Sequence, residues 1–166
     1  MNSQNFQTYF RGLQILFFAL LAGQVLLCGL MWFIIPIDRS SPEFTQDIWL
    51  NGIGVFSLLL AGLSMWLGKK TTESARVQPN LLQKLVVYRS AKILSWALIE
   101  GATMVNVVFF YLSGRIEFMY LAACAIGFFA TNIPRKDKLI NELDLSSTEL
   151  AMIENPNADV TSPRNE

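Results

Sequence analysis

The chain has 166 residues, of which 52% are hydrophobic, and its 13 basic and 13 acidic residues give a formal net charge of zero. Zero net charge argues against a nucleic-acid partner. The chain has no histidine, and Cys28 and Cys124 both lie inside apolar blocks, so we expect no metal site, no cofactor and no disulfide framework.

The apolar residues fall in four blocks, and most of the charged residues lie between them. A soluble helix would instead carry a polar stripe along one face. This distribution predicts an all-α fold, a four-transmembrane-helix bundle with spans at about residues 12–37, 48–67, 91–113 and 116–133. We expect residues 1–134 to form the membrane domain and residues 135–166 a cytoplasmic tail.

The first block, from Gly12 to Ile37, could also be read as a cleaved signal peptide. A signal's apolar region is about 7 to 15 residues long. Here the apolar run continues through Ile34 and Ile35 up to Pro36, which favours a membrane span.

The longest internal connection runs from Thr71 to Asn80 and is predicted to be irregular as far as Pro79, a residue suited to the first turn of a helix. Apolar residues then follow at Leu81, Leu82, Leu85 and Val86, with Lys84 and Arg89 among them. This pattern predicts an amphipathic cytoplasmic extension before the third span, and hence a third helix much longer than a span requires.

In the tail, Ser146 and Glu149 have the spacing of a capping box, which predicts a short helix over about Thr148 to Glu154. From Asn155 onward the apolar content is too low for folding, so this part of the tail is predicted to be disordered.

Basic residues are distributed unevenly between alternate connections. Only Arg39 and Arg115 fall on one side, whereas eleven fall on the other. By the positive-inside rule, this imbalance predicts an integral protein of a bacterial-type plasma (inner) membrane with both termini cytoplasmic. The cytoplasmic basic cluster comprises Lys69, Lys70, Arg76, Lys84, Arg89, Lys92, Arg135, Lys136 and Lys138.

Glu100 lies in the middle of the third span, about 12 Å along the helix from Lys92. A carboxylate at that depth costs several kcal/mol unless it is protonated, paired or hydrated. The candidate ion- or proton-binding residues are Glu100, Thr103, Gln24, Ser57 and Ser64. Three interpretations stay open: a protonated acid hydrogen-bonded to Gln24 or a serine, a carrier that loads and releases a proton or cation, and a polar ligand pocket.

The run Ala97-Leu98-Ile99-Glu100-Gly101-Ala102 resembles the carboxylate-bearing helix of the proteolipid c subunit of rotary ATP synthases. Upstream, Arg76-Val77-Gln78-Pro79 is similar to that family's Arg-Gln-Pro loop with one residue inserted. The resemblance covers roughly residues 50–112. It implies that Glu100 carries an ion and that Arg76, Gln78 and Pro79 meet the rotor stalk.

Catalysis needs several converging groups. Because the spans contain no histidine and no deep lysine, we expect no catalytic residues and a non-enzymatic role. The predicted function is a structural or accessory component of a membrane assembly with a buried protonatable carboxylate; the alternative is a proton- or cation-translocating subunit. The expected partners are the lipid bilayer and either further copies of the chain or another membrane protein.

Overall fold

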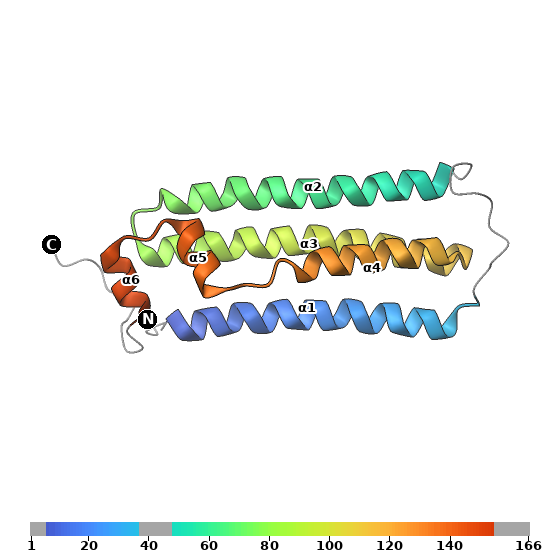
Figure 1. Cartoon of the computed structure of the whole chain (residues 1–166), viewed down its shortest axis with the longest axis horizontal. Helices are drawn as coiled ribbons and strands as arrows, with labels where there is room; N and C mark the ends of the chain where they lie inside the picture. Colours follow the sequence, from blue (N-terminus) through green and yellow to red (C-terminus); the bar gives the residue numbers. More distant parts are fainter. Residues whose placement is uncertain (1–5, 37–47, 155–166) are drawn as a thin grey trace.

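The computed structural model describes residues 6–36 and 48–154, which form six helices. Three of them are long and apolar enough to cross a membrane: α1 (Phe6–Ile34), α2 (Ile48–Arg76) and α3 (Leu81–Ser113). The shorter apolar helix α4 (Ile116–Ala130) returns alongside α3, and the small helices α5 (Lys136–Leu143) and α6 (Ser147–Glu154) follow. The long helices lie side by side, and the start of α1 is at the same end of the bundle as α5 and α6 (Figure 1).

Helix α3 is the central element of the bundle. Its buried residues recur every three or four positions from Leu81 to Phe110, so one continuous stripe faces the neighbouring helices. Asn80 occupies the N-cap position without a side-chain capping bond, and Gly114, with φ of 66°, ends the helix in the left-handed conformation that glycine adopts without strain. The long third helix that the sequence predicts is confirmed, at 33 residues or about 50 Å.

Helix α2 differs from the prediction, because it continues to Arg76 and does not end near Leu67. The hydroxyls of Thr71 and Thr72 donate hydrogen bonds to the backbone carbonyls four residues earlier in the same helix. Ala75 is fully buried in the core beside α3 and α5. Burial of the last turn therefore outweighs the weak helix preference of its threonines and serine.

Helix α4 has 15 residues, about 22 Å, and is shorter than the predicted fourth span. It begins directly after the Gly114 turn and packs Phe118, Met119 and Ala122 against the core. Phe129, near its other end, stacks on Phe17 of α1 with ring centroids 4.8 Å apart.

The segment after α4 is more ordered than a simple tail. Leu139 and Leu143 of α5 and Ile153 of α6 join the same core as Leu85 and Tyr88 of α3. The capping box is confirmed: the Ser146 backbone N–H donates to Glu149 at 2.9 Å, and the Glu149 N–H donates to the Ser146 hydroxyl at 3.3 Å. The disorder predicted beyond Asn155 lies outside the described residues.

Large apolar side chains stay exposed along α1 and α2, among them Leu26 at 72% and Leu58 at 74% exposed. Water-soluble monomers rarely expose apolar surface on this scale. The outer faces of these helices are thus matched to lipid.

Candidate functional site

Polar side chains connect the long helices at three levels. Thr103 of α3 donates to the Gln24 side-chain oxygen of α1 at 3.1 Å, and Asn106 of α3 donates to the Ser57 hydroxyl of α2 at 2.8 Å. All of these groups except Ser57 are fully buried. Hydrogen bonds of this kind hold helices together where water is absent.

The third level is the pairing of Ser64 on α2 with Ser95 on α3. Their hydroxyls lie 2.7 Å apart, and each also donates to the other residue's backbone carbonyl, at 2.9 and 3.1 Å. Gly68 lies one turn further along α2, where an added Cβ would be 3.3 Å from the Ser95 hydroxyl. The missing side chain at Gly68 therefore lets the two helices approach closely.

Glu100 is half-buried and makes no hydrogen bond or ion pair with residues 6–36 and 48–154. The expected bond between Glu100 and Gln24 is not formed, and the Gln24 side-chain oxygen instead accepts from Thr103. Two buried donors lie near this level of the bundle without a partner in the described chain: the Gln24 side-chain nitrogen and the indole nitrogen of Trp96, one turn before Glu100.

The five candidate residues therefore do not form one cluster of contacts. Thr103 and Gln24 are in contact, whereas Ser57 pairs with Asn106 and Ser64 pairs with Ser95. The sequence reasoning missed the last two partners. Asn106 lies three residues beyond Thr103 and Ser95 five before Glu100, so their place on the buried stripe of α3 was the available signal.

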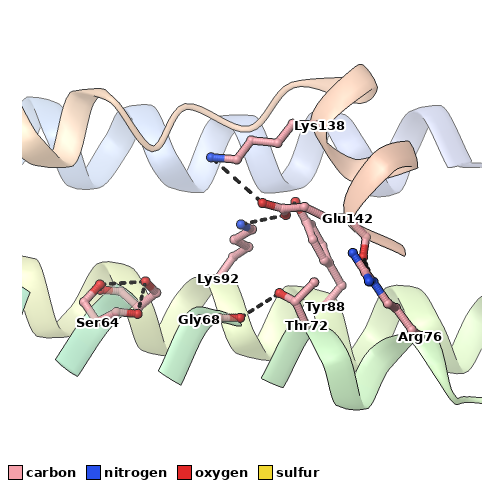
Figure 2. A network of polar contacts seen from close by, with 9 residues as sticks. Ser64, Gly68, Thr72, Arg76, Tyr88, Lys92, Lys138 and Glu142 are labelled. Atoms are coloured by element: carbon pink, nitrogen blue, oxygen red, sulfur yellow. Dashed lines mark hydrogen bonds and ion pairs between the residues drawn. The ribbon is translucent and has the colours of Figure 1, made fainter. Parts of the chain in front are cut away.

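Beyond the apolar region, Glu142 of α5 joins three elements (Figure 2). Its carboxylate accepts a hydrogen bond from the Tyr88 hydroxyl at 2.8 Å, and it lies 2.9 Å from the Lys92 ammonium and 4.0 Å from that of Lys138. Its backbone carbonyl accepts from the Arg76 guanidinium. One acid thus fastens α5 to both α2 and α3.

Glu149 does the same for α6. The Lys84 ammonium of α3 lies 3.0 Å from both of its carboxylate oxygens. Burial alone would raise the pKa of Glu149, but the Ser146 N–H and Lys84 favour the charged form and together hold that pKa below its ordinary value.

The predicted basic cluster is therefore divided among several environments. Arg76, Lys92 and Lys138 meet at Glu142, Lys84 pairs with Glu149, and Lys70 lies over the Trp66 ring at 4.9 Å from its centroid. The side chains of Arg89, Arg135 and Lys136 are exposed. Glu142 was not predicted, although its spacing from Lys138 is that of a helical ion pair.

Two cavities border these contacts. The first, here called the polar cleft, has a volume of about 370 Å³ and lies between α2, α3 and α5. Its charged lining consists of Lys69, Glu73, Arg76, Lys92, Lys138 and Glu142. The second, the apolar groove, has a volume of about 390 Å³ and lies between α2, α3 and α4. Its lining includes Leu58, Ala61, Gly62, Met65, Leu121 and Phe128.

Three apolar helices of membrane-spanning length, with large side chains exposed along them, define the class: this is a multi-pass integral membrane protein. No protein-family model, no curated protein and no solved structure matches the chain. The resemblance to the proteolipid c subunit therefore rests on the quoted residues alone. In the part of the chain that the structure describes, no group of three or more His, Cys, Asp or Glu residues is arranged to hold a metal ion.

Proposed function

We propose that the chain crosses the membrane four times, with both termini in the cytoplasm of a cell with a bacterial-type inner membrane. The beginning of α1, the α2–α3 connection and helices α5 and α6 lie at one end of the bundle (Figure 1). Arg11 and the basic cluster, whose members lie at the end of α2, in the first part of α3 and in or next to α5, belong to that end. The positive-inside rule assigns it to the cytoplasm.

The fourth span in this proposal is α4 with the turn that follows it. The backbone N–H groups of Thr131 and Asn132 donate to carbonyls of Phe128 and Phe129, and the Asn132 amide also donates to Phe128. The internally hydrogen-bonded segment is therefore longer than α4 itself, about 25 Å for 17 residues. A span slightly shorter than the hydrocarbon core is accommodated by local thinning of the bilayer.

Within the membrane, the chain acts as a non-enzymatic component of an assembly, and Glu100 faces a second membrane chain. The observation that carries this proposal is the half-buried Glu100 carboxyl, which lacks a partner in the described chain at a depth where an unpartnered acid is costly. A polar group on another helix, in a second copy or a different protein, would satisfy it.

The test is the mass of the complex extracted in mild detergent. Glu100→Gln keeps a hydrogen-bonding side chain and should preserve the assembly, whereas Glu100→Leu should dissociate it. Glu73→Gln changes an exposed carboxylate on α2 and serves as the control. A monomeric wild-type protein, or an assembly that persists in Glu100→Leu, would refute the proposal.

The second candidate function is proton translocation through Glu100. The observation favouring it is the pair of buried unpartnered donors, the Gln24 amide and the Trp96 indole, near the level of Glu100, whose carboxyl is neutralised by no cation among residues 6–36 and 48–154. Unsatisfied buried groups of this kind often hold ordered water. Because both are donors, they complement water or carboxylate oxygens and favour a proton over a metal cation.

Labelling with dicyclohexylcarbodiimide separates the two functions. A proton carrier should be labelled at Glu100 at neutral pH and protected by raised pH, and Glu100→Gln should abolish proton flux in proteoliposomes while leaving the assembly intact. If flux were absent from wild-type proteoliposomes, or unchanged in Glu100→Gln, translocation by this residue would be ruled out.

A further inference from the structure

The polar cleft and the apolar groove are neighbours. Met65 of α2 lines both cavities, with the polar cleft on the side of α5 and the apolar groove on the side of the bundle's middle. The same order holds along α4 and the turn after it, since Phe128 lines the groove and Asn132 the cleft. A charged compartment thus continues directly into an apolar one, which is the shape expected for an amphipathic ligand.

The charges of the cleft favour an anion. Four basic side chains and two carboxylates line it, leaving an excess of two positive charges. Glu142 is already engaged by Lys92 and Lys138 (Figure 2). Arg76 donates only its Nε to the Glu142 carbonyl. Its terminal nitrogens and the Lys69 ammonium have no partner among residues 6–36 and 48–154.

Those free donors suit a phosphate group. The planar guanidinium of an arginine can present two parallel N–H groups to phosphate oxygens, and a nearby lysine adds a point charge. Basic pockets between membrane helices near the cytoplasmic surface are suited to anionic lipid headgroups.

The groove has room for an acyl chain. At Gly54 an added Cβ would lie 3.9 Å from the Leu121 side chain, so α2 and α4 are close there. At Gly62, two turns further along α2 and also in the groove lining, an added Cβ would have nothing within 4 Å. The groove is therefore open at Gly62.

We propose that the cleft and groove together bind one anionic phospholipid, with its phosphate held by Arg76 and Lys69 and an acyl chain lying against Gly62. This site goes beyond the proposed function and does not involve Glu100, so either can fail without the other.

The test measures phosphatidylglycerol retained by the full-length protein in native mass spectrometry, as the lipid is titrated into micelles containing phosphatidylcholine. The double variant Lys69→Gln with Arg76→Gln should bind phosphatidylglycerol roughly 30-fold more weakly, from about 1 kcal/mol for each charge lost. Lys69→Gln alone breaks no contact within the described chain and should weaken binding about fivefold.

The matched control is Arg89→Gln with Lys136→Gln, which removes two exposed charges outside the cleft. If this control lost as much phosphatidylglycerol binding as the Lys69→Gln, Arg76→Gln double variant, the effect would come from general surface charge, and the proposed site would be wrong. Gly62→Leu fills the groove without altering the charges and should weaken phospholipid binding about tenfold or more, by excluding the acyl chain. Unchanged phospholipid binding in Gly62→Leu would overturn the groove as the acyl-chain site. Competition by millimolar inorganic phosphate would show that the cleft takes a free anion and not a lipid.

Discussion

Replacing Glu142 with glutamine should loosen α5 while leaving the helix bundle folded. Glutamine has nearly the same shape and can still accept from Tyr88, so the substitution mainly removes the negative charge. The Lys92 ammonium, 2.9 Å away on a side chain only 14% exposed, would then have no counter-charge at that position.

The size of the effect follows from this burial. Removing one partner of a fully buried ion pair costs about 3–5 kcal/mol, whereas exposed pairs contribute about 0–1 kcal/mol. With Lys92 at 14% and Glu142 at 27% exposed, we expect about 2 kcal/mol, which corresponds to roughly 30-fold more frequent opening of α5.

Hydrogen exchange read by mass spectrometry on the peptide covering 136–143 measures that opening. Asp144→Asn is the control, because it removes a charge one residue after α5 at an exposed position where φ is 49°, a conformation that asparagine tolerates. If the 136–143 peptide exchanged no faster in Glu142→Gln than in Asp144→Asn, the role assigned to Glu142 in holding α5 against α2 and α3 would be wrong.

Three further outcomes are expected. Leu139→Ala, at a fully buried position of α5, should destabilise docking of that helix by about 2–5 kcal/mol and expose it to limited proteolysis. Because the folded pKa of Glu149 lies below its ordinary 4.5, its contact with Lys84 stabilises α6 above about pH 4.5, and this stabilisation is lost as the pH falls through the folded pKa. Hydrogen exchange of α6 measured as a function of pH would detect the loss. Thr103→Val should lower the free energy of unfolding in detergent, measured by thermal denaturation, by about 0.5–1.5 kcal/mol, because the buried Gln24 oxygen loses its donor.

Each of these outcomes has a control. Asn141→Ala changes an exposed residue of α5 and should leave proteolysis unaffected. Glu149→Gln should abolish the acid-dependent loss of α6 protection. Thr71→Val removes a hydroxyl that bonds only within its own helix, so a stability loss equal to that of Thr103→Val would contradict the interhelical assignment.

The sequence predicted those parts of the fold that depend on local pattern. The apolar blocks marked the cores of α1, α2 and α3, and the charged connection located the start of α3 to within two residues of Pro79. The spacing of Ser146 and Glu149 identified the start of α6, because a capping box is formed by residues three apart.

The parts that were missed depend on contacts between distant segments. The last turn of α2 is stabilised by burial of Ala75, and α5 by burial of Leu139 in the same core. Neither is visible from a window of neighbouring residues. The pairing of Gln24 with Thr103 and not Glu100 depends on the axial register between α1 and α3. A single sequence contains no direct signal for that register.

The position of Glu142 in the chain also sets an order of biosynthesis. This acid is translated after α4, yet the residues that it fastens belong to α2 and α3, which leave the ribosome much earlier. Tyr88 and Lys92 therefore have no contact with this carboxylate until α4 and α5 have been synthesised. Docking of α5 on α2 and α3 therefore has to follow the synthesis of α4.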